Sequence, residues 1–101
     1  MCGIAGILNF NENHSNNLMF IKKITNTIKH RGPDDLNIYS NQEQGIYFGH
    51  TRLSIIDLSN NGSQPMVSFN KRYVIIFNGE IYNHEKLRKN INEYLLNKTE
   101  Y

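Results

Sequence analysis

The chain opens with Met1-Cys2-Gly3-Ile4-Ala5-Gly6-Ile7-Leu8, and this segment constrains its fold more than any other. Residues 2–8 form a short apolar run interrupted by two glycines, a pattern typical of a buried strand that other backbone approaches closely. The run begins with Cys2, the single cysteine of the 101-residue chain. One cysteine excludes an internal disulfide, so its place at the head of a core strand requires another explanation.

Beyond this strand, the spacing of apolar residues predicts two helices and several more strands. An amphipathic helix that ends before Gly32-Pro33 is predicted from Leu18, Ile21, Ile24 and Ile28. A second helix, capped by Asn83, is predicted from Leu87, Ile91, Tyr94 and Leu95. β-branched and aromatic residues predict strands that pair as neighbours at 38–39, 46–48 and 53–56, and the clearest buried strand at 73–77. This order indicates an α+β fold in one domain.

Composition limits the classes of function. Hydrophobic residues make up 39% of the chain and charged residues 20%, which fits a globular protein rather than a disordered or membrane protein. The net charge of +2 comes from 11 basic and 9 acidic residues without a basic cluster, so we expect no nucleic-acid partner. No apolar run approaches the roughly 18 to 20 residues of a membrane span, and no signal peptide is recognisable. We expect a cytoplasmic protein without a membrane partner.

Cys2 is a candidate nucleophile because of its position. A free thiol, with an ordinary pKa of about 8.5, is mostly protonated at neutral pH unless a base takes its proton. If an aminopeptidase removes Met1, Cys2 gains an α-amino group, whose ordinary pKa is about 7.7 to 8.0, on its own Cα. Nucleophile and base would then share one residue, which suits acyl transfer to water through a thioester. A buried structural cysteine is an equally open alternative on position alone.

Two further features could act with Cys2. Asn78-Gly79 follows the apolar residues 73–77 and offers a side-chain amide and an accessible backbone N–H, the donors that an oxyanion needs. By itself, an Asn-Gly pair usually marks a turn. Arg52 is a charge among apolar residues, and its planar fork matches the α-carboxylate of an amino acid. An internal salt bridge, for example to Asp57, explains Arg52 equally well.

The remaining histidines and acidic residues are not expected to hold a metal or to act as a general base. The residues around Gly32-Pro33 fit no usual zinc or calcium spacing, and we interpret them as a loop with ion pairs: His30, Arg31, Asp34 and Asp35. The other histidines lie on unrelated elements and are interpreted as surface or hydrogen-bonded core residues: His14, His50 and His84.

Five blocks of sequence, in order and spread over nearly all 101 residues, carry a family resemblance. They are Met1-Cys2-Gly3-Ile4-Ala5-Gly6, His30-Arg31-Gly32-Pro33-Asp34-Asp35, His50-Thr51-Arg52-Leu53-Ser54-Ile55-Ile56-Asp57, Gly62-Ser63-Gln64-Pro65-Met66 and Phe77-Asn78-Gly79-Glu80-Ile81-Tyr82-Asn83-His84. Together they resemble the N-terminal glutaminase domain of glutamine-hydrolysing asparagine synthetases, which are class II glutamine amidotransferases. The first block is shared with other members of that class, whereas the second and fifth favour asparagine synthetases.

The resemblance implies a fold and a set of site residues. The fold would be the N-terminal nucleophile hydrolase sandwich, two antiparallel sheets between helical layers (α/β/β/α), and residues 1–101 would form only its first half. Cys2 would be the catalytic nucleophile, with Asn78 and Gly79 as the oxyanion hole. Arg52 would bind the glutamine carboxylate, in a pocket lined further by Leu53, Ser54, Ile55, Ile56 and Glu80.

The resemblance also implies what the hydrolysis serves. Glutamine would be cleaved to glutamate and ammonia without a cofactor or metal. In the full-length protein, a C-terminal synthetase domain using ATP and Mg²⁺ would pass the ammonia to aspartate. Sugar-modifying amidotransferases look similar at this end, so a sugar or other acceptor is an alternative, as is a truncated non-catalytic fragment; a homodimer is left open.

One residue of the family pattern has no match in this chain. The family holds the glutamine α-amino group with an aspartate in a Ser-Asp-x-Glu segment downstream of the second helix. The nearest match here, Asn97-Lys98-Thr99-Glu100, has Lys98 in place of the aspartate. We therefore expect the segment to lie beyond Tyr101. Such a truncation would leave sheet edges unpaired and predicts low stability or aggregation for this segment alone.

Overall fold

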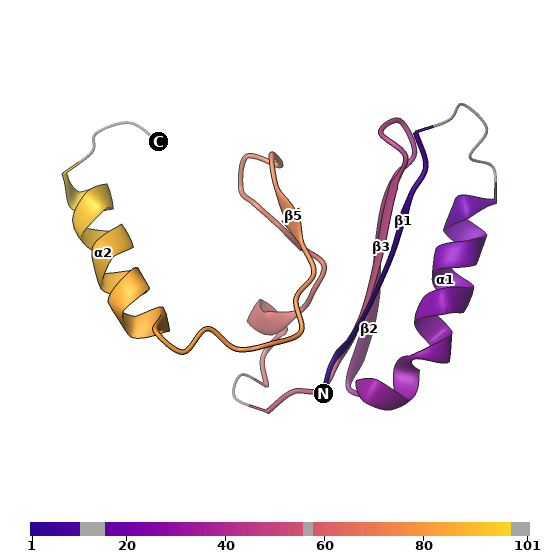
Figure 1. Ribbon diagram of the computed structural model, residues 1–101, viewed down its shortest axis with the longest axis horizontal. Coiled ribbons are helices and arrows are strands. Elements are labelled where there is room, and N and C mark those ends of the chain that lie inside the picture. The colour runs from indigo at the N-terminus through magenta and orange to yellow at the C-terminus, as the bar shows by residue number, and fades with distance from the viewer. Residues whose placement is uncertain (11–15, 56–57, 98–101) are drawn as a thin grey trace.

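The computed structural model describes residues 1–10, 16–55 and 58–97 (Figure 1). Its elements in chain order are β1 (Gly3–Leu8), α1 (Asn17–Thr27), η1 (Lys29–Arg31), β2 (Asp35–Asn41), β3 (Ile46–Arg52), η2 (Asn60–Gly62), β4 (Met66–Val67), β5 (Val74–Ile75) and α2 (His84–Leu96). Helices are combined with antiparallel sheets, so the predicted α+β class is confirmed. No helix in the described ranges has the length and apolar character that crossing a membrane requires.

β3 is the central strand of a three-stranded antiparallel sheet with the order β1-β3-β2. β2 and β3 are neighbours, as expected, and Gly45 in the turn between them has a φ of 70°, a left-handed conformation that glycine adopts without strain. β1 pairs with β3 in the register that sets Gly3 opposite Thr51. This register brings Cys2, just before β1, next to Arg52 at the end of β3.

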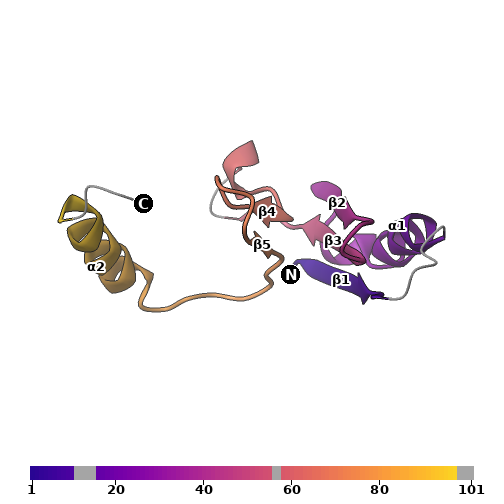
Figure 2. The same ribbon diagram turned by 90° about the horizontal axis from the view of Figure 1, so that it is seen from above.

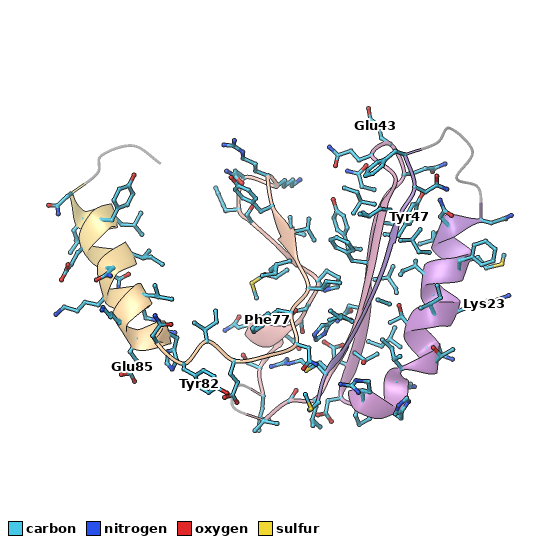
Figure 3. The ribbon with its side chains drawn as sticks, viewed as in Figure 1. Lys23, Glu43, Tyr47, Phe77, Tyr82 and Glu85 are labelled. Atoms are coloured by element: carbon cyan, nitrogen blue, oxygen red, sulfur yellow. The ribbon has the colours of Figure 1, made fainter. Side chains whose placement is uncertain are left out.

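α1 packs on one face of this sheet (Figure 1). The fully buried Ile21 and Thr25 of the helix face the sheet, and Tyr47, 2% exposed, lies between β3 and α1 (Figure 3). Gly49 on β3 has no room for a side chain, because a Cβ there would lie 2.8 Å from Cβ of Thr25. The close approach of helix and strand at this glycine forms the small core.

The buried face of α1 differs from the predicted one. Of the four apolar residues expected on it, only Ile21 is fully buried, and Ile28 is half-buried. Leu18 and Ile24 are 39% and 43% exposed. Thr25 takes the central position because the glycine opposite it admits only a small side chain. The apolar spacing therefore predicted the helix and its buried Ile21 correctly, whereas Ile24 lies off the packed face and Thr25 lies on it.

A second sheet, formed by β4 and β5, lies on the face of the first sheet opposite α1 (Figure 1). Residues 73–77 were predicted to be the clearest buried strand, which is wrong for the described structure. Only Val74–Ile75 pair as a strand, and the side chains of Tyr73 and Ile75 are 63% and 53% exposed. Strand propensity is local, whereas burial requires a packing partner, and the described part of the chain leaves these side chains open to solvent.

The predicted strand at 53–56 is also wrong where the structure describes it. β3 ends at Arg52, and residues 53–55 form a loop. The N–H of Ser54 donates to Oδ2 of Asp34 at 2.8 Å, a side-chain acceptor rather than a neighbouring strand. Because the Ser54 N–H donates to a side chain and not to a neighbouring strand, residues 53–55 do not continue the hydrogen-bonded sheet. Ile56 and Asp57 lie outside the described residues.

α2 stands apart from both sheets (Figure 2). The helix begins after Asn83, as predicted, although the Asn83 side chain makes no capping hydrogen bond. Its apolar residues are between 37% and 57% exposed: Leu87, Ile91, Tyr94 and Leu95. The order of elements across Figure 1 is therefore α1, the three-stranded sheet, the two-stranded sheet and α2.

Candidate functional site

A pocket of about 570 Å³ opens where β1 begins and β3 ends. Eight of the nine predicted site residues line it: Cys2, Arg52, Leu53, Ser54, Ile55, Asn78, Gly79 and Glu80. The ninth, Ile56, lies outside the described residues. Residues from three separate segments of the chain thus meet at one concave surface, which the β1–β3 register and the stacking of the second sheet bring together.

Cys2 is half-buried directly before the start of β1, and its thiol contacts the Leu53 backbone. Its Sγ accepts a hydrogen bond from the N–H of Leu53 at 3.4 Å and lies 3.9 Å from the Leu53 carbonyl oxygen. Both contacts hold the sulfur against the backbone of the residue that follows Arg52. A thiol on a pocket wall can react with a ligand, unlike the fully buried structural cysteine of the alternative interpretation.

The Cys2 backbone is held from the side by η1. Arg31 donates from Nε to the Cys2 carbonyl oxygen at 3.1 Å. η1 reaches this position because Gly32 approaches the backbone of β3 so closely that a Cβ would lie 2.5 Å from the Arg52 N atom. The glycine thus allows the loop to fix Cys2, the residue before β1, relative to β3.

Arg52 is a nearly buried cation in the pocket wall, with 7% of its surface exposed. Its Nη1 donates to the Ser59 carbonyl oxygen at 2.6 Å. The guanidinium packs on Gly62, where a Cβ would lie 2.9 Å from Arg52 Cζ. These contacts fix the plane of the guanidinium in the pocket wall. The alternative salt bridge involves Asp57, which lies outside the described residues.

Asn78 and Gly79 do not form the tight turn that an Asn-Gly pair favours. The chain passes through them in an extended path with a bend at Gly79, and then continues toward α2. The residue before them, Phe77, donates its N–H to Oε1 of Gln64 at 2.5 Å, and its carbonyl lies 3.3 Å from Nε2 of His50. The pair therefore lies on the pocket wall next to a hydrogen-bonded residue.

His50 is a core residue, 1% exposed, and only one of its ring nitrogens is hydrogen-bonded. His50 is thus a hydrogen-bonded core residue, as interpreted, although Nδ1 has no partner among the residues that the structure describes. Burial lowers the pKa of His50 from its ordinary value of 6.5; the Phe77 hydrogen bond and the Asp35 carboxylate oppose this, and Arg52 adds to it. His50 is therefore a neutral imidazole at neutral pH that donates from Nε2.

The acidic residues after Gly32-Pro33 have neutral partners instead of the predicted ion pairs. Asp34 accepts from the Ser54 N–H, and Oδ2 of Asp35 accepts from the Ser63 hydroxyl and the Asn37 amide, both at 2.8 Å. Backbone and amide donors reach these carboxylates because the loop packs against the end of β3. In the described ranges, no group of three or more histidine, cysteine or acidic residues could hold a metal ion.

Some pocket residues were given no role by the sequence: Met1, Gly62, Gln64, Phe77 and Tyr82. All five belong to the quoted sequence blocks, so the signal was present, but nothing in the sequence separates a pocket residue from a structural one within a block. Met1 was set aside because its removal was expected. In the nearest match to the segment that would hold the glutamine α-amino group, Asn97-Lys98-Thr99-Glu100, residues 98–100 lie outside the described residues.

Comparison with known proteins bears on the chemistry of this pocket. The model of a family described as glutamine amidotransferase domain matches residues 1–99. The chain is 41% identical over 93 residues to the glutamine-hydrolysing asparagine synthetase 3 of Bacillus subtilis, a match that covers 90% of this chain and 15% of that protein. It is 36% identical over 94 residues to the glutamine-hydrolysing asparagine synthetase 1 of Arabidopsis thaliana, covering 93% and 16%.

A third relative, the nodule glutamine-hydrolysing asparagine synthetase of Pisum sativum, is 36% identical over 91 residues, a match that covers 90% of this chain and 15% of that protein. The chain thus spans about 15% of the length of the curated relatives that it matches. No solved structure matches it significantly.

Proposed function

The chain belongs to the glutamine amidotransferase domain family, and we therefore propose that it carries the glutamine-hydrolysing site of a class II amidotransferase, with Cys2 as the nucleophile. The observation that carries this proposal is the pocket, which unites the Cys2 thiol, the Arg52 cation and the Asn78-Gly79 donors. Each is a different requirement of amide hydrolysis on an amino acid, and they come from three separate segments.

The proposed reaction begins after removal of Met1. The α-amino group of Cys2 takes the thiol proton, and Sγ attacks the amide carbon of glutamine. The Asn78 side-chain amide and the Gly79 N–H stabilise the oxyanion that forms. The tetrahedral intermediate then breaks its C–N bond, and ammonia leaves with the proton from the Cys2 ammonium. Water attacks the resulting thioester with the same amine as base, which releases glutamate and restores the thiol.

The pocket walls carry residues that would pair with the separate parts of glutamine. The nearly buried Arg52 would pair with the α-carboxylate, and the backbone of Leu53, Ser54 and Ile55 would run along the side chain of the substrate. Glu80 borders the same pocket and carries a charge opposite to that of the substrate ammonium group. The pairing of Arg52 with the α-carboxylate would be a charge-assisted hydrogen bond, which is stronger than a bond between neutral groups.

We assign the fold to the first half of the N-terminal nucleophile hydrolase sandwich. Family membership supports this assignment, and so does the order of elements in Figure 1, where the two antiparallel sheets lie between α1 and α2. Cys2, the proposed nucleophile, lies directly before β1, an edge strand of the three-stranded sheet.

The ammonia acceptor is proposed to be aspartate, because the matching relatives are named asparagine synthetases. ATP and Mg²⁺ would be bound by a synthetase domain in the full protein, a part of the relatives that this chain does not span. We therefore assign none of the present residues to these groups. A sugar acceptor predicts a different activity, namely glutamine turnover that depends on the sugar and is unaffected by aspartate.

The test is glutamine hydrolysis by the full chain and by its Cys2→Ala variant. The proposal predicts release of glutamate and ammonia by the unaltered protein and none by the variant, with both proteins showing the same thermal unfolding. Serine at the same position, which preserves shape but is a weaker nucleophile, should leave only a small residual rate. Undiminished hydrolysis by Cys2→Ala would refute the proposal.

A further inference from the structure

The Phe77 backbone is held on both sides by side chains to which no role has been assigned so far. Its N–H donates to Oε1 of Gln64 at 2.5 Å, and its carbonyl oxygen accepts from Nε2 of His50, 3.3 Å away. Gln64 and Phe77 line the same pocket as Cys2, and Figure 3 shows Phe77 where the second sheet approaches the first. The held residue directly precedes Asn78 and Gly79.

The Gln64 contact begins where the backbone ladder ends. β4 and β5 pair through Val67–Val74 and Met66–Ile75, and the same register continued by two residues would set Gln64 opposite Phe77. At this point the side-chain amide of Gln64 accepts the Phe77 N–H. The Gln64 amide thus fixes the backbone of Phe77, the residue before Asn78 and Gly79, beyond the point where β4 and β5 are paired.

The His50 contact joins the two sheets. His50 shares a face of β3 with Arg52, since side chains two apart along a strand point to the same side. The imidazole is buried between β3 and the segment after β5, with 1% of its surface exposed. Because Nδ1 is unpartnered in the described structure, the Phe77 carbonyl is the acceptor that defines the tautomer with a proton on Nε2.

We propose that His50 and Gln64 are positioning residues, which clamp the Phe77 backbone and thereby direct the Asn78 amide and the Gly79 N–H toward Cys2. This inference rests on the proposed function of those donors. Oxyanion donors act only when they are preorganised, and a misplacement of about 1 Å can cost about 100-fold in rate. Neither His50 nor Gln64 needs to touch the reacting atoms for this effect.

The experiment compares Gln64→Leu with Gln64→Glu in the full chain. Leucine removes the acceptor for the Phe77 N–H, whereas glutamate keeps an oxygen at the same reach. The proposal predicts that Gln64→Leu lowers kcat for glutamine hydrolysis by about 10- to 100-fold with little change in KM, and that Gln64→Glu restores most of kcat. The His50→Leu and His50→Gln pair should show the same order, because glutamine keeps a donor.

A matched control is Ser68→Ala, in the same two-stranded ribbon. Ser68 Oγ accepts the Tyr73 N–H at 3.0 Å, so this variant also removes a side-chain acceptor from a backbone donor, but away from the pocket. It should leave kcat unchanged. Thermal unfolding of all variants separates loss of rate from loss of fold. If His50→Leu unfolds, Gln64→Leu and Gln64→Glu decide the question, because the Gln64 contact is exposed and its loss should not unfold the protein.

The outcomes separate the clamp from the function on which it rests. Hydrolysis that survives in Cys2→Ala would overturn the function itself. If Cys2→Ala is inactive but Gln64→Leu keeps its full kcat, only the clamp is overturned. A raised KM with unchanged kcat in Gln64→Leu would also overturn the clamp, because it would make Gln64 a substrate contact.

Discussion

Replacing Arg52 by methionine should weaken glutamine binding, because the variant loses the proposed interaction with the α-carboxylate of the substrate. Arg52 is 7% exposed, and its guanidinium is oriented by the Ser59 carbonyl at 2.6 Å and by packing on Gly62. A hydrogen bond to a charged group contributes about 1.5 to 3 kcal/mol. At about 1.36 kcal/mol per tenfold change, KM for glutamine should rise about 10- to 150-fold. The interaction is present before and during reaction, so kcat should change little.

The assay compares glutamine with glutamine α-amide, in which the carboxylate is neutral. The KM of the unaltered protein for glutamine should be lower than its KM for the α-amide by a similar factor of about 10 to 150. Arg52→Met should show no such preference, because removing the arginine and removing the substrate charge abolish the same interaction. Arg72→Met, which removes an arginine that lies over the Tyr73 ring outside the pocket, should preserve the preference. Equal losses for both substrates in Arg52→Met would refute the carboxylate assignment and leave Arg52 a structural role.

Three further predictions concern stability. Gly49→Ala forces a Cβ into α1 and should destabilise the fold by about 1 to 3 kcal/mol. Gly6→Ala should be nearly neutral, because its Cβ would have its nearest contact at 3.4 Å. The midpoints of denaturant unfolding curves distinguish the two variants. Ile21→Ala, at a fully buried position, should cost about 2 to 5 kcal/mol, and Ile24→Ala, at a 43% exposed one, much less in the same assay. The pKa of His50 in the folded protein is lowered from its ordinary value of 6.5. Burial of the neutral imidazole therefore contributes fully to the free energy of unfolding above pH 6.5, and this contribution is lost as the pH falls through the lowered pKa. His50→Asn should therefore flatten the fall in unfolding free energy below pH 6.5; an unchanged slope in urea titrations would contradict this origin.

The sequence predicted the residues of the pocket better than their surroundings. Cys2, Arg52 and Asn78-Gly79 could be selected because amide hydrolysis requires a nucleophile, a carboxylate partner and oxyanion donors, and the structure places all of them on one pocket. Their catalytic and binding roles remain predictions. The hydrogen bond from Arg52 to the Ser59 carbonyl was not predictable, because it depends on a loop conformation that no periodicity encodes.

Errors in the fold arose where tertiary packing overrides local preference. The apolar spacing of α1 was correct for a helix, yet Thr25 rather than Ile24 faces the sheet because Gly49 leaves little space opposite it. Residues 73–77 have strong strand propensity, but propensity does not show whether a second layer covers the strand. The Gly3–Thr51 register joins residues far apart in sequence, and no local pattern indicates which strands pair.

The identity of the nucleophile can be tested by intact-mass and peptide mass spectrometry of the full chain after incubation with a diazoketone analogue of glutamine. Met1 lines the pocket, and its retention would block the amine proposed as the base. We predict a protein that lacks Met1 and carries one adduct on the Cys2 sulfur, formed more slowly when glutamine is present. A protein that keeps Met1 and still hydrolyses glutamine, or an adduct on another residue, would contradict the assignment of Cys2.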